Sequence, residues 1–421
     1  MKKFIINGGK PLNGSIEVSG MKNAALPVLF ATILTEDICV IENIPEIDDV
    51  TLALDILRKM GARIKMLDST TAEIDTSKVS GGTAPFDLVR KMRASYYLVG
   101  AELGRFHKAT VGLPGGCDFG VRPIDQHIKG FEALGSTVEI TNGVIRAKAD
   151  DEMHPAEIFF DVITVGGTIN IMLAASRIPG LTIIENAARE PHIVDLANFL
   201  NTCGAKISGA GTDTIKIKGV SQLHGCNYAI IPDMIEAGTF MLAAAATKGS
   251  LEIKNVIPRH LESITAKLRE MGVEVIEDDE SVIVTYKKAL HKINVKALPY
   301  PGFPTDMQPQ MCVLMTLCNG TSILTDGVYD NRFKYVDELR RMNADISVDG
   351  RTAVIYGTDK LLPATVRAID LRAGAAMVIA GLATDGETVI EDVHHIERGY
   401  DNIVGKLCAV GADIKTVKYD D

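Results

Sequence analysis

One cysteine lies where its side chain could take part in chemistry rather than in packing. Cys117 is at the centre of a loop, residues 113–123, that contains three glycines, and Arg122 follows five residues later. Glycine-rich loops are often mobile and functional, and a nearby guanidinium can lower the pKa of a thiol. Cys117 is therefore a candidate nucleophile or proton donor, although its spacing alone leaves an inert thiol equally open.

The other six cysteines lie in or beside apolar segments, where a buried and inert thiol is the expectation: Cys39, Cys203, Cys226, Cys312, Cys318 and Cys408. None of them forms a C-x-x-C pair, so the sequence predicts no structural zinc site. An odd number of cysteines fits free thiols in a reducing compartment.

Arginines recur at matched positions, about 70 residues apart, in loops that precede helix-like segments: Arg122, Arg189, Arg259, Arg332 and Arg398. A single loop arginine is not evidence of function, and even five at matched positions could result from duplication of the unit alone. If three units surround an axis, however, equivalent loops meet at one end. The guanidinium groups would then line a cleft between domains that suits carboxylate and phosphate.

A second set of matched positions opens six apolar, helix-like segments: Lys22, Arg93, Gly166, Ile235, Asp306 and Arg372. A helix N-terminus attracts anions through its free N–H groups and its dipole. A lysine or arginine there opposes the dipole, which indicates either anion binding or a structural ion pair.

These positions belong to a unit of about 70 residues that occurs six times along the chain. Each unit has an apolar helix that should be buried on all sides, a short β-rich run, and a second helix with one apolar face, such as Val50, Leu54, Leu57 and Met60. Glycine, or asparagine once, ends this second helix where a positive φ is expected: Gly61, Gly135, Gly204, Gly272, Asn343 and Gly411. Two globular α/β domains of three units each are predicted, and a stacked solenoid is the alternative.

The bulk properties exclude several classes of function. The 421 residues carry a formal net charge of −10, which argues against broad nucleic-acid binding but not against a small anion held by local cations. The longest apolar run, residues 24–34, is too short to cross a bilayer. Nothing at the N-terminus suggests secretion, so a cytoplasmic location is expected.

Eight motifs follow one another along essentially the whole chain: SGMKNAALP from Ser19, MRAS from Met92, PGGC-x-x-G-x-RP-x-D-x-H from Pro114 to His127, IENAAREP from Ile184, FPTDMQ from Phe303, NRF from Asn331, DLRA from Asp370 and HIERGY from His395. Together they closely resemble the UDP-N-acetylglucosamine enolpyruvyl transferase family. The resemblance implies transfer of the enolpyruvyl group of phosphoenolpyruvate to the 3′-hydroxyl of UDP-N-acetylglucosamine, with release of phosphate, as the first committed step of peptidoglycan synthesis.

The implied reaction explains the residue types. C3 of phosphoenolpyruvate is protonated while the hydroxyl attacks C2, and the tetrahedral ketal then collapses with loss of phosphate. This needs an acid, a base and cations, but no metal and no cofactor. The two substrates are the expected partners, without nucleic acid or membrane, and the oligomeric state stays open.

The family's functional residues match positions of this chain. The resemblance makes Cys117 the proton donor, which can form an adduct with phosphoenolpyruvate and be alkylated by fosfomycin, and makes Asp306 the base. Lys22, Arg122 and Arg398 would hold the anionic substrate and the developing charge, with Asn23 beside the lysine. Three arginines match further cations of the cleft: Arg93, Arg332 and Arg372. The residues that match the nucleotide-sugar contacts are Arg122, Pro123, Ile124, Asp125, Gln126, His127, Thr164, Val165 and Val328.

Two assignments keep an alternative. His127 could be a neutral structural histidine, and Asp370 could pair with an arginine instead of acting as a second acid or base.

The implied fold is a two-domain inside-out α/β barrel, with three βα units around a pseudo-threefold axis in each domain and a cleft that closes on the substrates. Residues 22–231 would form the first domain, with the Cys117 loop. Residues 1–21 and 232–421 would form the second, with Asp306 and Arg398.

Two rival functions remain. A 5-enolpyruvylshikimate-3-phosphate synthase shares the fold and the chemistry but lacks the PGGC loop. A catalytically silent paralogue could bind the nucleotide sugar as a regulator, although Lys22, Cys117, Asp306 and Arg398 are all present.

Overall fold

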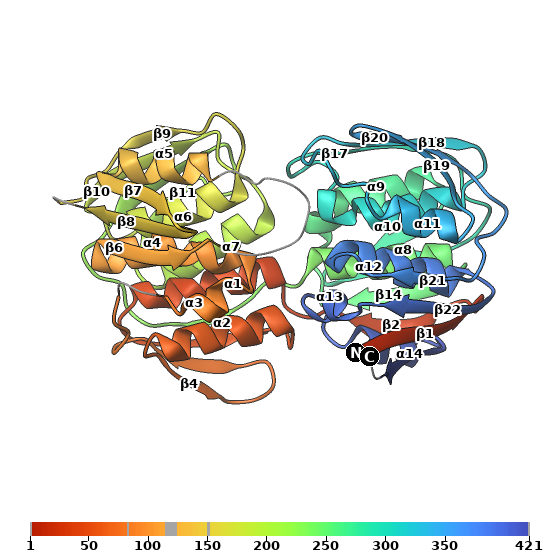
Figure 1. The fold of residues 1–421 in the computed structure, drawn as a ribbon, viewed down its shortest axis with the longest axis horizontal. Coiled ribbons are helices and arrows are strands. Elements are labelled where there is room, and N and C mark those ends of the chain that lie inside the picture. Colours follow the sequence, from red (N-terminus) through yellow and green to blue (C-terminus); the bar gives the residue numbers. More distant parts are fainter. Residues whose placement is uncertain (1, 82–83, 114–123, 150–151, 420–421) are drawn as a thin grey trace. The chain divides into compact units, whose positions relative to one another are not determined.

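The computed structural model in Figure 1 describes residues 2–81, 84–113, 124–149 and 152–419. The chain divides into two compact units. The continuous unit is Gly20–Ile231, and the split unit combines Met1–Ser19 with Pro232–Asp421.

The continuous unit alternates helices and strands. Its helices are α1 (Lys22–Ala31), η1 (Thr32–Leu34), α2 (Asp48–Lys59), α3 (Phe86–Val89), η2 (Arg93–Tyr96), α4 (Tyr97–Phe106), α5 (Asp125–Ala133), α6 (Val165–Ala175) and α7 (Pro191–Thr202). Its described strands form three sheets, and the first has the spatial order β13 (Asn227–Ala229), β3 (Ile38–Glu42), β5 (Ala72–Asp75), β4 (Arg63–Met66). The second sheet has the order β6 (Lys108–Gly112), β8 (Val144–Ala149), β7 (Ser136–Thr141). The third has the order β11 (Lys206–Ser208), β12 (Thr214–Gly219), β10 (Gly180–Glu185), β9 (Glu157–Phe159).

The split unit has the same kinds of element. Its helices are α8 (Met234–Ala246), η3 (Pro258–Leu261), α9 (Glu262–Glu270), η4 (Thr305–Met307), α10 (Gln308–Thr316), α11 (Val336–Arg341), α12 (Leu371–Ala383), α13 (His394–Glu397) and α14 (Ile403–Ala409). Its described strands also form three sheets, and the first has the order β15 (Glu274–Glu277), β16 (Ser281–Thr285), β14 (Ser250–Lys254), β2 (Asn13–Glu17). The second sheet has the order β17 (Asn294–Ala297), β18 (Thr321–Asp326), β20 (Thr352–Tyr356), β19 (Asp345–Asp349). The third has the order β21 (Thr365–Arg367), β22 (Gly386–Glu391), β1 (Lys2–Gly8), β23 (Ile414–Lys418).

The apolar helices form the core, as their composition predicts. In α8 and α10 all residues are buried, and α12 is buried from Arg372 to Leu382. These three helices pack against one another inside the split unit, and sheets lie outside them (Figure 1). Burial on every side removes the need for a polar face, which explains why these helices lack amphipathic periodicity. Over the described residues each sheet is open, with two edge strands.

The second helices end as the sequence predicts. Gly61, Gly135, Gly204, Gly272 and Gly411 have φ between 89° and 106°, and Asn343 has φ 68°. This left-handed conformation reverses the chain directly after the helix, and it costs glycine little because glycine has no Cβ.

A recurring asparagine fixes where the chain leaves three of the central strands. Asn43, Asn186 and Asn255 have φ near 55° and follow β3, β10 and β14. Each side-chain amide donates to a backbone carbonyl, of Ile230, Phe160 and Val18, at 2.7–2.8 Å. Asparagine tolerates the left-handed region, and its amide satisfies a carbonyl at the end of a strand.

No described helix combines the length and the apolar character that crossing a bilayer requires.

Candidate active site

The carboxylate of Asp306 lies between two buried guanidinium groups in the split unit. Arg372 donates through Nε and Nη2 to Oδ2 at 3.1 Å, and Arg332 donates through Nη2 to Oδ1 at 3.2 Å. The side chains of Arg372 and Arg332 are only 5% and 3% exposed, whereas that of Asp306 is 29% exposed. One partly accessible carboxylate therefore faces two buried guanidinium groups, and the buried carboxylate of Asp233 also acts on the charge of Arg372.

Helix starts bring these three residues together. Asp306 is in the single turn η4 that leads into α10, and Pro309 in the first turn of α10 suits a helix start. Arg372 is the second residue of α12, and α10 packs on α12. The apolar helices must pack closely, so their first turns meet at one place.

Asp370 holds the first turn of α12. Its carboxylate accepts hydrogen bonds from the backbone N–H groups of Arg372 at 2.8 Å and Ala373 at 2.9 Å. This is an N-cap, which stabilises a helix by about 1 kcal/mol. The structure thus gives Asp370 a third role, as a helix cap that positions Arg372.

Arg372 is charged and has donor capacity to spare. Burial opposes the charge, but the carboxylate of Asp306 and the hydroxyl of Tyr400 raise the pKa of this arginine above its ordinary value. The guanidinium lies 5.5 Å from the centre of the Tyr400 ring. Its Nη1 atom is buried and has no hydrogen-bond partner among the described residues.

Val328 and Arg398 lie on other loops of this unit. The buried carboxylate of Asp326 accepts the backbone N–H groups of Val328 at 2.8 Å and Tyr329 at 2.9 Å, which fixes the turn after β18. Arg398 directly follows α13. Burial, His394 and Arg398 together lower the pKa of His395, so the charge of Arg398 is felt at that ring.

Lys22 opens α1 in the continuous unit and forms a close ion pair. Its Nζ lies 2.6 Å from Oδ2 of Asp49 in the first turn of α2, and the two side chains are 12% and 6% exposed. The structural ion pair left open for this position is therefore present. Asn23 is half-buried beside the lysine.

His127 is held as a neutral acceptor. Its Nδ1 accepts from the side-chain amide of Asn170 at 3.0 Å, and the amide orientation is fixed because Oδ1 of Asn170 accepts the N–H of Gly100 at 2.9 Å. Burial, assisted by Arg93, lowers the pKa of His127 to about 4. The proton of the neutral ring is consequently on Nε2, and the neutral reading of this residue is the one that the geometry favours.

Gly166 allows this arrangement. A Cβ on Gly166 would come within 2.8 Å of the His127 ring and 3.0 Å of the hydroxyl of Tyr96. The ring of Tyr96 in turn packs edge-on against His127, and Arg93 lies 6.0 Å from the Tyr96 ring centre. The glycine that opens α6, where other units have a charged residue, is thus explained by close packing.

The remaining nucleotide-sugar candidates lie at two helix starts. Thr164 caps α6 by accepting the N–H of Gly167 at 3.2 Å, and Val165 follows it. Ile124 and Asp125 begin α5, where the buried side chain of Gln126 donates to Asp125 at 2.8 Å and accepts the N–H of Asp161 at 2.9 Å.

Some predicted residues fall elsewhere. Cys117, Arg122 and Pro123 lie outside the described residues. Arg189 forms an exposed ion pair with Asp213 at 3.1 Å, and Arg259 is in the short helix η3. Arg332 is the loop arginine whose ion pair with Asp306 is described above.

Sequence reasoning missed several residues that support the site. Asp49, Asn170, Tyr96 and Tyr400 each hold a candidate residue in place. Two left a signal, because Asn170 is a polar residue within an apolar helix and Asp49 is an acid at a helix start.

Comparisons with known proteins identify the family. A sequence model of the EPSP synthase (3-phosphoshikimate 1-carboxyvinyltransferase) family matches residues 6–407. The UDP-N-acetylglucosamine 1-carboxyvinyltransferase of Clostridium botulinum is 56% identical over 98% of this chain and 99% of its own length. The UDP-N-acetylglucosamine 1-carboxyvinyltransferase 2 of Geobacillus kaustophilus is 54% identical over 100% and 98%.

Solved structures agree with this result. The enolpyruvyl transferase NikO from Streptomyces tendae matches with a TM-score of 0.90 and 25% identity, over 100% of this chain and 99% of that one. An EPSP synthase from Acinetobacter baumannii matches with a TM-score of 0.78 and 17% identity over the full length of both chains, which supports the fold alone. The family expected from the motifs is confirmed, and the chain belongs to the UDP-N-acetylglucosamine 1-carboxyvinyltransferases within the wider EPSP synthase family.

Proposed function

We propose that this chain transfers the enolpyruvyl group of phosphoenolpyruvate to the 3′-hydroxyl of UDP-N-acetylglucosamine and releases phosphate. The observation that carries the proposal is identity of 56% over nearly the whole length to a protein of that name, together with the Asp306 cluster. Phosphoenolpyruvate carries a carboxylate and a phosphate, and planar guanidinium groups bind both in a bidentate manner.

Arg372 and Arg332 form the anion-binding side of the reaction. Because Nη1 of Arg372 lacks a partner among the described residues, it can donate a hydrogen bond to a substrate oxygen without first breaking a contact. Such preorganised donors stabilise charge that develops in the transition state. Lys22 and Arg398, with Arg93 and Asn23, supply further polar contacts to the anionic groups.

Asp306 acts as the base at the acceptor hydroxyl. Its carboxylate is partly exposed, so a sugar hydroxyl can reach it, while the two arginines fix its orientation. The hydroxyl oxygen attacks C2 of phosphoenolpyruvate as its proton moves to the carboxylate, and Cys117 delivers a proton to C3. Loss of one proton from the C3 methyl group and of phosphate from the ketal then yields the product.

The nucleotide sugar binds to the segment from Arg122 to His127, to Thr164 and Val165 at the start of α6, and to Val328. Neutral His127 offers its Nε2–H as a donor, and the two caps Thr164 and Asp326 keep the adjoining backbone fixed.

We propose that residues 22–231 form one domain and that residues 1–21 and 232–421 form the other, and the division into two compact units near these bounds supports the proposal. Each domain is half of an inside-out α/β barrel protein, with three βα units around a pseudo-threefold axis. The recurring positive-φ residues and the three sheets described in each unit support this repeat. The proposed catalytic residues belong to both domains, so we expect the nucleotide sugar to bring the domains together. Small-angle scattering should record a smaller radius of gyration with ligand, and an unchanged radius would count against closure.

The experiment that tests the function measures phosphate release from phosphoenolpyruvate with each acceptor in turn. We expect release with UDP-N-acetylglucosamine and none with shikimate-3-phosphate. Turnover with shikimate-3-phosphate would instead favour the related synthase, and binding without turnover would favour a regulatory paralogue. The substrates are soluble, and the expected place of action is the cytoplasm.

A further inference from the structure

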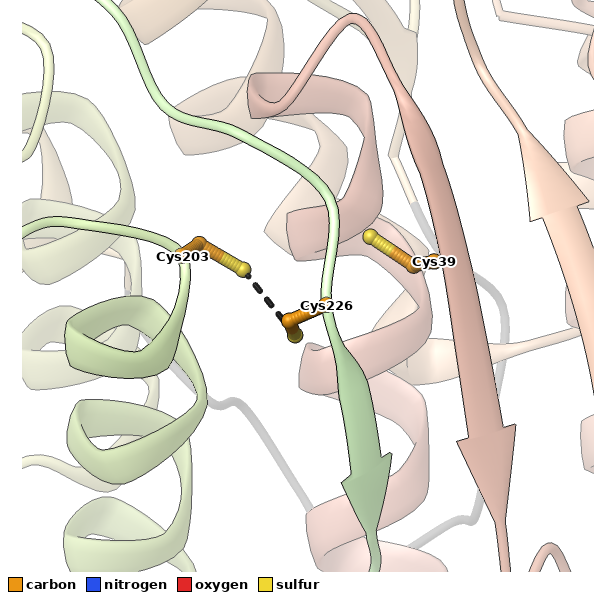
Figure 2. A group of neighbouring side chains, drawn as sticks. All are labelled: Cys39, Cys203 and Cys226. Atoms are coloured by element: carbon orange, nitrogen blue, oxygen red, sulfur yellow. Dashed lines mark hydrogen bonds between the residues drawn. The ribbon is translucent and has the colours of Figure 1, made fainter.

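Three cysteines that are far apart in the sequence meet in the continuous unit (Figure 2). The Sγ atoms of Cys39, Cys203 and Cys226 all lie within 4.8 Å of one another, and those of Cys203 and Cys226 are 3.4 Å apart. Cys39 and Cys203 are buried, and Cys226 is half-buried. Among the described residues, no other group of cysteine, histidine or carboxylate side chains converges in this way.

Three rigid elements hold the thiols. Cys39 is in β3, Cys226 directly precedes β13, and Cys203 follows the last residue of α7. The strands run parallel with Asn227 beside Val40, so Cys226 and Cys39 point to the same face of the sheet.

Two backbone hydrogen bonds tie these elements together. The N–H of Val40 donates to the carbonyl of Cys226 at 2.9 Å, and the N–H of His224 donates to the carbonyl of Cys203 at 2.9 Å. The three sulfurs are therefore held close by the fold itself, which reduces the cost of organising a ligand set.

From this geometry we propose that the cluster of Cys39, Cys203 and Cys226 is a binding site for one thiophilic monovalent cation, Cu⁺, in three-coordinate all-sulfur geometry. Thiolates select soft ions such as Cu⁺. A metal–sulfur bond of about 2.3 Å would place three sulfurs roughly 4.0 Å apart in a trigonal plane, so shifts of less than about 1 Å complete the site.

The ligand count favours Cu⁺ over Zn²⁺. Structural zinc is almost always bound by four protein ligands, and the described residues provide three in this group. The cluster also adjoins the C-terminal end of α7, where the helix dipole favours a cation. On binding, sulfur–copper bonds replace S–H bonds, the released protons pass to solvent, and copper stays in the +1 state.

A disulfide between Cys203 and Cys226 is the competing interpretation, since their sulfurs are already in contact. Formation of that bond by a peroxide would shorten the distance to about 2.05 Å and would leave Cys39 without a role. The two interpretations therefore differ in whether Cys39 is needed.

The test is an anaerobic titration of the full reduced chain with Cu⁺ in competition with a chromophoric chelator. We expect one Cu⁺ per chain to be held at least 100-fold more tightly than by Cys39→Ser or Cys226→Ser. The matched control Cys318→Ser, a buried thiol outside the cluster, should bind as the unaltered chain does. All four chains keep Cys117 and Cys408, so the differences report on the cluster alone.

A second measurement needs no variant and therefore tests the proposal even if a cysteine variant folds poorly. X-ray absorption of the unaltered chain with one Cu⁺ should give three sulfur neighbours at about 2.3 Å. Undiminished binding by Cys39→Ser, two sulfur neighbours only, or tighter retention of Zn²⁺ than of Cu⁺ would each overturn the proposal.

Discussion

Lys22 and Asp306 both lie at the starts of apolar helices, yet their charges are balanced differently. Lys22 in the continuous unit faces Asp49 at 2.6 Å, one cation with one carboxylate. Asp306 in the split unit is shared by Arg332 and Arg372, one carboxylate with two cations. In the first arrangement one carboxylate faces one cation, whereas in the second two guanidinium groups share a carboxylate and Nη1 of Arg372 is a buried donor with no partner among the described residues.

This difference indicates which unit can bind an anion without rearrangement of an existing ion pair. In the split unit a donor of Arg372 has no partner among the described residues, so we expect a phosphate or carboxylate to gain a contact there without displacing one. In the continuous unit an anion must compete with Asp49 for Lys22. We therefore expect substitutions in the Asp306 cluster to affect turnover most.

The largest effect is expected for Asp306→Asn. An amide cannot accept the proton of the sugar hydroxyl, so turnover should fall by about 10³-fold, within the range for loss of a general base. Steady-state phosphate release measures this loss. Asp337→Asn changes an exposed carboxylate that pairs with Arg340 at the surface and should leave turnover unchanged. Equal activity of Asp306→Asn and the unaltered chain would remove Asp306 from the mechanism.

His127→Gln should change the pH dependence of stability. The pKa of His127 is about 4 in the folded chain and about 6.5 when unfolded. Between these pH values the unfolded chain binds more protons than the folded chain. The contribution of His127 to the free energy of unfolding therefore falls as the pH drops from 6.5 to 4, and it is constant above pH 6.5. The full loss is about 3 kcal/mol.

Urea unfolding at pH 7.5 and at pH 4.5 checks this prediction. The unaltered chain should lose more stability between the two pH values than His127→Gln does. The difference between the two losses should approach the full contribution of His127. Parallel losses in the two proteins would mean that His127 is not held neutral by the fold.

Arg372→Lys separates charge from geometry. Lysine keeps the positive charge but cannot donate in a fork to Oδ2 of Asp306, so kcat/KM for phosphoenolpyruvate should fall by about 100-fold. Arg332 donates to Oδ1 of Asp306 through Nη2 alone, at 3.2 Å, so Arg332→Lys should cost about 10-fold. The exposed Arg341 is the control, since Arg341→Lys should be silent. If Arg332→Lys were the more damaging change, the bidentate contact would not be the important one.

Asp49→Asn tests the other half of the comparison and should have the smallest kinetic effect. The ion pair is largely buried, so its loss should lower stability by about 1–3 kcal/mol and kcat/KM by about 10-fold or less, because Lys22 keeps its charge but loses its anchor. Thermal unfolding and steady-state kinetics measure the two effects. A kinetic loss as large as that of Asp306→Asn would mean that the two helix starts contribute equally.

The sequence predicts repeating patterns well and partnerships poorly. The glycines and the asparagine after the second helices, and the burial of the apolar helices, follow from local periodicity. Burial was expected for six cysteines, and it is wrong for Cys408, which is exposed at the end of the short helix α14.

Contacts between distant segments left little trace in the sequence. Asp370 is an N-cap, a role that the sequence did not predict and that depends on the backbone N–H groups of Arg372 and Ala373. The meeting of Cys39, Cys203 and Cys226 depends on the parallel pairing of β13 with β3, which no spacing of cysteines predicts. Site residues matched by family motifs could be named in advance, whereas the groups that hold them in place required the fold.

The central claim is that the chain adds a proton to C3 of phosphoenolpyruvate and later removes one, as a tetrahedral ketal forms and collapses. The most direct measurement is the mass of the product formed from phosphoenolpyruvate and UDP-N-acetylglucosamine in deuterium oxide. The account predicts deuterium at the vinyl carbon, because the methyl group of the ketal contains one solvent-derived hydrogen and loses one hydrogen on collapse. A product of the expected mass with no deuterium at that carbon would contradict addition and elimination.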